Sequence, residues 1–216
     1  MAIYKQKQDK LIPLKEKKIN LEKTVQGVVE KNISDVFGFE FVSSEFPLNN
    51  LRIDTLAFDQ DLKCFVIIEY KKDRSFSVID QGYAYLALLL NNKADFILEY
   101  NEKSKKNLKR DDIDWSQSRV IFIANSFTKY QQEAVGFQDL PIELWTINQY
   151  EEDLLLLNEI KASERSESIK TVAKGRNVDI VSKEIKYYSI EDHLKHGSID
   201  TRNWYEELSQ KILDLE

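Results

Sequence analysis

The sequence predicts an α/β fold in which a mixed central β-sheet is flanked by helices and followed by a C-terminal helical extension. Segments with helical spacing of apolar residues alternate with strand-like runs in the order αβββαβ, as expected when helices cover a mixed sheet. The chain has 216 residues, of which only six are glycine and three are proline. Long regular elements are therefore expected to dominate one ordinary domain with an appendage.

The first predicted element is an amphipathic helix over residues 19–37, with Asn20 suited to the N-cap position. Its apolar side chains recur at intervals of three and four residues: Leu21, Val25, Val28, Ile33 and Val36. A strand signal then begins at Phe39 and continues through residues 51–58. The run that follows, residues 63–70, is almost continuously β-branched or aromatic, which is typical of a central strand.

Further elements follow along the chain. The stretch between the first two strand signals, residues 59–62, is short and polar, so an antiparallel hairpin is expected there. The remaining predictions are a helix over 77–91, a helical stretch over 93–100, a loop over 101–114, a strand over 118–124, a helix over 128–136, a strand over 142–147 and an edge strand over 153–160.

Three regions are predicted. Residues 1–160 form the main domain, residues 161–186 a linker rich in serine, lysine and glutamate, and residues 187–216 a helical C-terminal segment. The last segment carries one apolar face, made of Trp204, Leu208, Ile212 and Leu215. A helix of that length cannot bury such a face alone. It is expected to pack on the main domain, on a second copy or on further residues, and it could begin a second domain.

Composition excludes several classes of protein. Cys64 is the only cysteine, so an internal disulfide and a cysteine-rich zinc site are excluded and a reducing cytoplasm is expected. The most apolar run, at residues 86–90, is far too short to cross a membrane. No glycine loop suited to nucleotide phosphates is present. His193 and His196 lack a third ligand and are interpreted as surface residues, while Trp145 is interpreted as packing.

The net charge of −6 argues against a general polyanion binder, although basic residues are unevenly distributed. The first 31 residues carry eight lysines against four acids, and residues 103–110 carry five basic side chains. These stretches could line a phosphate backbone or could simply be solvated surface.

Two acidic residues on neighbouring predicted strands carry the functional hypothesis. Asp54 lies inside an apolar strand, where a carboxylate is costly unless it is paired or bound to a cation. Glu69 and Lys71 are two residues apart on the next strand, so they share a face while Tyr70 points away. If Asp54 lies opposite Glu69, the two carboxylates can share Mg²⁺ or Mn²⁺. The alternatives are an Asp54–Arg52 pair and a Glu69–Lys71 surface pair.

The predicted helix after the second strand adds two polar residues. Gln81 and Tyr85 are four residues apart and therefore lie on one face of that helix. Because the helix directly follows Glu69 and Lys71, this face can overlook the same site and hold a phosphate or a water molecule. The alternative is that Tyr85 is a packing residue and Gln81 a surface residue.

Taken together, R-I-D-T-L, V-I-I-E-Y-K and the Q-x-x-x-Y helix resemble the PD-(D/E)XK nucleases, a restriction endonuclease-like superfamily, and its RecB-like branch in particular. This resemblance implies Asp54, Glu69 and the Tyr70 carbonyl as metal ligands, with Lys71, Gln81 and Tyr85 as catalytic residues. It also implies a glutamate from the first helix, for which Glu30 is the first choice and Glu22 the second. Arg52 and Lys72 are expected to contact nucleic acid.

The resemblance extends to a family of uncharacterised bacterial proteins that has carried the label predicted transport protein. It rests on A-D-F, I-D-W-S, R-V-I-F-I-A, F-T-K-Y and I-E-L-W, and it covers roughly residues 20 to 160. Members often have a second, C-terminal domain, whose beginning the segment around Ser189 resembles. Nothing in the sequence supports transport, since no segment can span a membrane.

The sequence therefore predicts a divalent-metal-dependent nuclease that hydrolyses the phosphodiester bonds of DNA in the cytoplasm. A second hypothesis is a catalytically inactive nucleic-acid-binding or scaffold protein of the same fold. A third is a module that forms homodimers through the Trp204 helix. A shared fold does not establish shared chemistry. The residues of the site therefore have to distinguish these three hypotheses.

Overall fold

The computed structural model describes residues 2–17, 22–72, 77–136, 140–161, 181, 183–186, 188–195 and 197–214. They fall into two compact units, Met1–Ile185 and Lys186–Glu216. The described strands are β1 Tyr4–Lys7, β2 Lys10–Pro13, β3 Glu16–Lys17, β4 Glu40–Leu48, β5 Leu51–Asp59, β6 Cys64–Lys71, β7 Arg119–Ala124, β8 Ile142–Tyr150 and β9 Leu155–Ile160. The described helices of the first unit are α1 Glu22–Lys31, α2 Ile33–Phe37, α3 Val78–Asn91, α4 Lys93–Ser104 and α5 Lys129–Ala134, with short 3₁₀ turns at Arg110–Asp112, Trp115–Gln117 and Glu151–Asp153.

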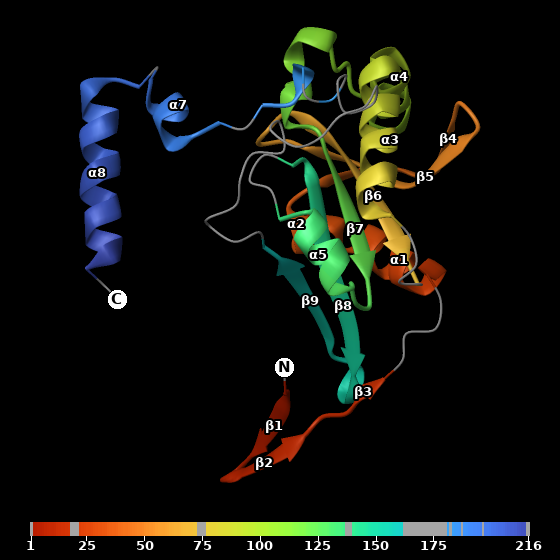
Figure 1. Ribbon diagram of the computed structural model, residues 1–216, viewed down its shortest axis with the longest axis vertical. Helices are drawn as coiled ribbons and strands as arrows, with labels where there is room; N and C mark the ends of the chain where they lie inside the picture. The colour runs from red at the N-terminus through yellow and green to blue at the C-terminus, as the bar shows by residue number, and fades with distance from the viewer. Residues whose placement is uncertain are drawn as a thin grey trace. The chain divides into compact units, whose positions relative to one another are not determined.

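A mixed central sheet organises the first unit (Figure 1). Its strands lie in the order β3-β8-β7-β6-β5-β4, and β9 also pairs with β8. The neighbours β4, β5 and β6 are antiparallel, whereas β6, β7 and β8 run parallel. The predicted α/β class and the predicted hairpin are thereby confirmed. Because parallel strands end at the same side, the carboxyl ends of β6, β7 and β8 form one border of the sheet, called the carboxyl edge from here on.

The two faces of the sheet bury different side chains, as strand alternation requires. Phe65 and Ile67 of β6 pack in one cluster with residues of α3 and α4. Val66 and Ile68 pack in a second cluster with residues of α1. We refer to these sides as the α3 face and the α1 face. Because β6 is buried on both faces, it reads in sequence as a continuous apolar run.

Helix α3 is held closely against the sheet. The Ser77 hydroxyl caps its first turn by accepting a hydrogen bond from the Asp80 N–H at 3.3 Å. One turn later, Gly82 allows a close approach to β8, since a Cβ atom at this position would lie 2.3 Å from Cδ1 of Ile142. The cap and the glycine together set the position of Gln81, which lies between them in the sequence.

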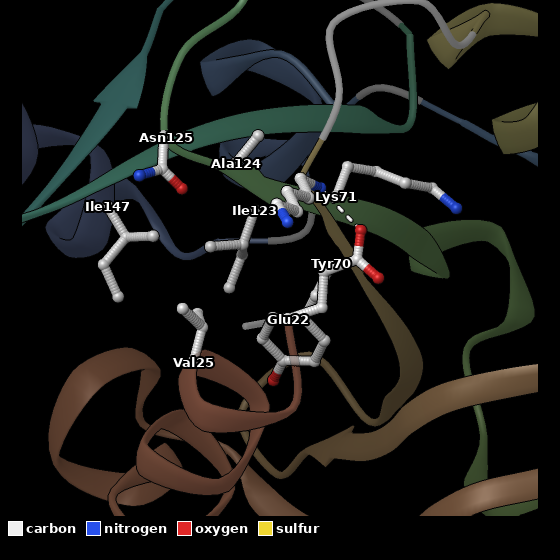
Figure 2. A pocket seen from close by; sticks show the side chains of 9 residues that line it. Glu22, Val25, Tyr70, Lys71, Ile123, Ala124, Asn125 and Ile147 are labelled. Carbon is white, nitrogen blue, oxygen red and sulfur yellow. Dashed lines mark hydrogen bonds between the residues drawn. The ribbon is translucent and has the colours of Figure 1, made fainter. Parts of the chain in front are cut away.

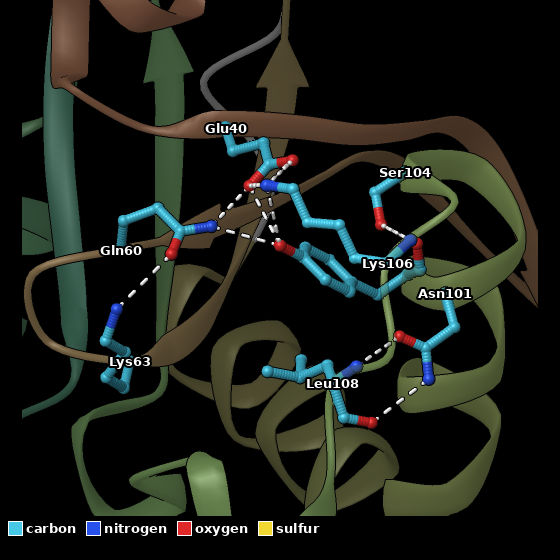
Figure 3. Close-up of polar contacts among 8 residues, drawn as sticks. Glu40, Gln60, Lys63, Asn101, Ser104, Lys106 and Leu108 are labelled. Atoms are coloured by element: carbon cyan, nitrogen blue, oxygen red, sulfur yellow. Dashed lines mark hydrogen bonds and ion pairs between the residues drawn. The ribbon is translucent and has the colours of Figure 1, made fainter.

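A polar cluster fastens α4 to β4 at the border opposite the carboxyl edge (Figure 3). The Glu40 carboxylate accepts hydrogen bonds from the Tyr100 hydroxyl at 2.9 Å and from Lys106 Nζ at 2.7 Å. The Gln60 amide also donates to Glu40, and to the Tyr100 hydroxyl at 3.0 Å. The buried Tyr100 phenol thus has its polar end satisfied, which lets its ring pack against Phe58.

Several predicted elements have different boundaries in the structure. The helix predicted over 19–37 is two helices, and the proposed cap Asn20 lies outside the described residues. The strand signal that begins at Phe39 divides into β4 and β5, because Asn49 and Asn50 both take positive φ, 49° and 63°, and close a tight turn. Asparagine tolerates this conformation better than most residues.

The structure also contains elements that the sequence pattern did not predict. The three strands before α1 lack the alternation that marks a half-buried strand, because every residue of β1 and β2 is exposed. The predicted loop over 101–114 contains the end of α4 and one 3₁₀ turn. Within the predicted linker, residues 162–180 lie outside the described residues, but Val181 and Ile185 are buried in the α3-face cluster.

The second unit contains α7 Ile190–Leu194 and α8 Ile199–Leu213. The predicted apolar face of α8 is solvent-exposed within this unit: Trp204 is 70% exposed, Leu208 60% and Ile212 56%. Leu215 and His196 lie outside the described residues. None of the helices in the described parts of the chain is both long and apolar enough to cross a lipid bilayer.

Candidate active site

The pairing of β5 with β6 stops at the residues that carry the functional hypothesis. The last backbone pair toward the carboxyl edge is Thr55 with Ile68. The next residues in this direction are Asp54 on β5 and Glu69 on β6. They lie opposite one another where the strands separate. In place of a ladder bond, the Tyr70 N–H donates to Oδ2 of Asp54 at 3.0 Å. The Asp54 carboxylate therefore occupies the gap between the two strands.

Glu69 and Lys71 form a shielded ion pair at the end of β6. The Nζ atom of Lys71 lies 2.8 Å from Oε1 of Glu69, and their side chains are 22% and 6% exposed. Strand alternation places both on the α3 face, in line with Phe65 and Ile67. The other carboxylate oxygen, Oε2 of Glu69, is buried and has no hydrogen-bond partner among the described residues. A carboxylate with one buried, unpartnered oxygen is costly unless a cation or a water molecule reaches it.

Burial and mutual repulsion disfavour two ionised carboxylates here. Burial raises the pKa of Glu69, and the charge of Asp54 raises it further, while Lys71 lowers it. Burial also raises the pKa of Asp54, and the hydrogen bond from the Tyr70 N–H opposes this. A single ammonium group thus does not compensate for both acids. A divalent cation would do so, because it attracts both carboxylates at once.

The donor set fits a hard cation. Asp54 and Glu69 supply carboxylate oxygens, and one of these oxygens lacks a partner. The Tyr70 carbonyl points to the same side of β6 as its N–H, which faces Asp54, because the N–H and C=O of a strand residue address the same neighbour. Oxygen ligands of this kind suit Mg²⁺ or Mn²⁺, with water completing the shell. Within the described residues, no group of three or more acidic, histidine or cysteine side chains is gathered for a metal ion.

Helix α3 brings Tyr85 to this site. The Tyr85 hydroxyl donates to the Arg52 carbonyl at 3.3 Å. Burial raises the pKa of Tyr85, and the negative charge of Glu69 raises it further. The phenol therefore stays protonated, and its O–H remains a hydrogen-bond donor. Gln81 lies one turn earlier on the same helix, and its side-chain oxygen is buried and has no partner in the described ranges of the chain. The structure thus brings Tyr85 to Glu69 and leaves Gln81, within those ranges, with an unused acceptor.

Glu30 is the helix glutamate that the resemblance favours for the site, but it does not lie beside Glu69. Its Oε1 atom accepts from the Thr55 hydroxyl at 2.6 Å and from the Gln26 amide at 2.9 Å. The Thr55 hydroxyl lies 3.3 Å from that of Tyr70, whose ring packs on the α1 face. Glu69 points to the α3 face, so the sheet separates the two glutamates. Glu30 completes a buried hydrogen-bond network between α1 and β5.

Glu22, the second choice, lies closer to the site. Its Oε1 atom accepts from the Lys72 N–H at 2.6 Å, and its charge contributes to the raised pKa of Asp54. Figure 2 shows Glu22 and Lys71 lining one pocket at the carboxyl edge, together with Asn125 at the end of β7. The pocket lies beside the last residues of β6 and opens on the α1 face, since Val25, Tyr70 and Ile147 of that cluster also line it. A carboxylate, two lysines and an amide side chain thus gather where the parallel strands end.

Arg52 has a partner that sequence reasoning missed. Its Nε atom lies 2.6 Å from Oε2 of Glu45, with the arginine side chain 64% exposed. Glu45 has a φ of 55°, which is unusual for a non-glycine residue inside a strand. The predicted alternative was an Asp54–Arg52 pair. In the structure Arg52 instead pairs with Glu45, and the Asp54 carboxylate accepts from the Tyr70 N–H. No pattern in the sequence signals Glu45, because its proximity depends on the β4–β5 register.

The remaining sequence interpretations concern residues away from this site. Trp145 packs edge-on against Phe37, with ring centroids 5.0 Å apart, which confirms its role in packing. Lys72 is exposed beside the pocket. His193 lies in the second unit, where its ring is near that of Tyr188.

Comparison with known proteins identifies a close relative. No protein-family model matches the chain. The chain is 46% identical over 217 residues to an uncharacterized protein of Haemophilus influenzae, a match that covers 100% of this chain and 72% of that protein. The name of this relative does not carry the transport label.

Three solved structures share weaker similarity. A repair endonuclease from Pyrococcus abyssi is 17% identical with a TM-score of 0.32, over 59% of this chain and 48% of that one. EndoMS in its apo form is 17% identical with a TM-score of 0.38, over 61% and 48%. Pyrococcus furiosus SfsA in complex with Ca²⁺ is 13% identical with a TM-score of 0.32, over 63% of each chain. The chain spans about half the length of the first two of these proteins. We therefore base the functional proposal on the residues of this chain.

Proposed function

We propose that this chain, which belongs to the same family as the uncharacterized Haemophilus influenzae protein, is a divalent-metal-dependent nuclease that hydrolyses DNA phosphodiester bonds. One observation carries the proposal. Asp54 and Glu69 meet where β5 and β6 separate, and Lys71 contacts Glu69. One oxygen of Glu69 is buried and finds no hydrogen-bond partner in the part of the chain that the structure describes. This arrangement is costly for stability and suits a site that binds a cation.

Asp54, Glu69 and the Tyr70 carbonyl would hold Mg²⁺ or Mn²⁺. When bound, such an ion stabilises negative charge that develops on a phosphoryl oxygen. Lys71 is a second source of positive charge, because its ammonium group is held 2.8 Å from Glu69 and only 22% of its side chain is exposed. It can orient an attacking water molecule by hydrogen bonding and can stabilise the charge of the phosphorane-like transition state.

The surrounding residues would bind and orient the substrate. Tyr85 keeps its proton and can donate to a phosphate oxygen once it leaves the Arg52 carbonyl. The unpartnered oxygen of Gln81 can accept a hydrogen bond from water. Arg52 uses Nε for Glu45, so its two amino groups can address a phosphate, and exposed Lys72 adds a second positive charge. A cytoplasmic location is part of the proposal and agrees with a single, buried cysteine.

The test is cleavage of DNA by the full chain in Mn²⁺ or Mg²⁺, with linear, nicked, branched and single-stranded substrates. Glu69→Gln and Asp54→Asn are expected to abolish cleavage and to weaken Mn²⁺ binding in calorimetry. Glu159→Gln, on the edge strand β9, is the control and should cleave as wild type does. The proposal is wrong if wild-type protein cuts none of these substrates and Glu69→Ala leaves Mn²⁺ affinity unchanged.

A second candidate function is a catalytically inactive, self-associating nucleic-acid-binding scaffold. The observation that favours it is the exposed apolar face of α8, where Trp204 is 70% exposed. Such a protein would bind DNA without cutting it and would dimerise through this helix. DNA binding by wild type that persists in Glu69→Gln, with no cleavage in any metal, would select this function.

A further inference from the structure

The first two strands of the chain form a hairpin that is exposed on both faces. Its register pairs Tyr4 with Pro13, Lys5 with Ile12, Gln6 with Leu11 and Lys7 with Lys10. All eight residues of β1 and β2 are exposed. An isolated two-stranded hairpin is marginally stable in water, so a hairpin without a buried face contributes little to folding. Its sequence is therefore free to serve another purpose.

The register sorts the hairpin side chains by charge. Directly paired residues of an antiparallel ladder share a face, and neighbouring residues alternate. One face therefore carries Lys5, Lys7, Lys10 and Ile12, and the opposite face carries the uncharged residues Tyr4, Gln6, Leu11 and Pro13. All three lysines of the two strands thus project to one side, a separation that the linear sequence does not display.

The lysines of the hairpin differ in whether an acidic side chain lies beside them. Near the base, Lys5 pairs with Glu152 at 2.6 Å, and Lys17 lies 3.8 Å from Asp153. Among the described residues, Lys7 and Lys10 have no ion-pair partner, although Asp9 in the turn lies next to Lys10 in the sequence. Like charges directly opposite one another on a ladder are destabilising. An anionic partner would relieve the repulsion between Lys7 and Lys10.

The hairpin is anchored at the same sheet border as the candidate active site. Glu16 and Lys17 pair with Tyr150 and Gln149, the last residues of β8. The Glu151 N–H donates to the Lys15 carbonyl at 3.0 Å. Since β6, β7 and β8 are parallel, their ends lie at the carboxyl edge, where Glu69 and Lys71 also lie. Figure 1 shows the hairpin projecting beyond this edge of the sheet.

We propose that this hairpin is a second contact for double-stranded DNA, in which Lys7 and Lys10 bind backbone phosphates away from the bond that is cut. The proposal rests on the proposed nuclease function, because it places one duplex across both the acidic pair and the hairpin. Duplex DNA carries regularly repeated phosphates, so one duplex can contact Lys71 at the candidate active site and Lys7 and Lys10 on the hairpin at the same time. The hairpin adds affinity without base recognition, since lysine contacts to phosphate carry no sequence information.

The test is the affinity of the full chain for a fluorescein-labelled duplex, measured by anisotropy at several salt concentrations with EDTA present. Lys7→Gln/Lys10→Gln is expected to weaken binding about tenfold at low salt and to reduce the slope of log K against log salt by about 2, since each phosphate contact contributes roughly 0.9. The matched control is Lys63→Gln/Lys161→Gln. Lys63 is the residue before β6, and Lys161 follows β9, whose last residue pairs with Leu144 near the start of β8, so both lie toward the opposite border.

The outcomes separate this inference from the nuclease proposal. Weaker binding and a lower slope in the hairpin variant alone support the inference. Equal binding by the hairpin variant and wild type overturns it, while cleavage by wild type would leave the nuclease function intact. Binding of phosphatidylglycerol vesicles that depends on Lys7 and Lys10, with no effect of either lysine on duplex binding, also overturns it. Circular dichroism of both variants checks that the fold is unchanged.

Discussion

Glu45 lies directly opposite Asp54 in the β4–β5 ladder, because the pairs on either side, Ser44 with Thr55 and Phe46 with Ile53, are both formed. Two acidic residues face each other across neighbouring strands, and the charge of Glu45 helps to raise the pKa of Asp54. Arg52 offsets Glu45 through an ion pair at 2.6 Å. Together with Glu69 on β6, three adjacent strands each place one carboxyl group in this part of the sheet.

This relationship predicts the pH dependence of Glu45→Gln. Burial, the largest cause, keeps the pKa of Asp54 above its ordinary value in both proteins, but loss of the Glu45 charge lowers it. Asp54 then ionises at lower pH, so the pH at which Mn²⁺ affinity falls to half should move down in the variant. Calorimetric titrations of Mn²⁺ at a series of pH values measure this midpoint. A midpoint that moves up would contradict the assigned repulsion.

A second prediction concerns Glu69→Gln and stability. The pKa of Glu69 is raised in the folded protein, so above its ordinary pKa the ionised form costs folding free energy, and this cost disappears as the pH falls below that value. At neutral pH without metal, Glu69→Gln is therefore expected to be more stable by about 1 kcal/mol. Urea denaturation measures the change.

Bound metal should make wild type more stable than Glu69→Gln, the reverse of the order expected without metal. Ions that bind only the folded state stabilise it by mass action, so Mn²⁺ should raise the stability of wild type and leave Glu69→Gln nearly unchanged. The same denaturation experiment with excess Mn²⁺ tests this. Equal stabilisation of both proteins would place the ion elsewhere.

A third prediction tests the placement of α3. The new Cβ of Gly82→Ala would lie 2.3 Å from Cδ1 and 2.8 Å from Cγ1 of Ile142, so the Ile142 side chain, the helix or the strand must shift. Overpacking of this kind costs about 1–3 kcal/mol. The control is Gly27→Ala in α1, where nothing lies within 4 Å of the new Cβ. Since alanine favours a helix by up to about 1 kcal/mol over glycine, this control should gain stability. A loss in Gly27→Ala and none in Gly82→Ala would contradict the described packing.

A fourth prediction addresses the exposed face of α8. If Trp204 and Leu208 mediate self-association, Trp204→Asp/Leu208→Asp should convert a dimer into a monomer without affecting the first unit. Light scattering after size exclusion measures the mass of each protein. The matched control is Glu206→Ala/Glu207→Ala on the same helix. A monomeric wild type would remove the dimer hypothesis and leave this face to another partner.

The sequence pattern predicted most of the sheet and part of the site. The long apolar run of β6 and the helical spacing of α3 produce strong local signals, because both elements are largely buried. The two all-exposed strands of the hairpin give no such signal, since alternation appears only where one face is buried. The division into β4 and β5 depends on two asparagines in the left-handed region, which hydrophobic periodicity does not report.

By itself, the sequence determined that Glu69 and Lys71 share one face of a buried strand while Tyr70 takes the other, because side chains on a strand alternate with a period of two. It also determined that Gln81 and Tyr85 follow this strand on one helix face. Only the tertiary structure placed Glu22 against the Lys72 N–H and Glu30 against Thr55, set Glu45 opposite Asp54, and brought the Lys7–Lys10 pair to the carboxyl edge. Each of these depends on strand register or on helix docking, which join residues far apart in the chain and leave no periodic trace in it.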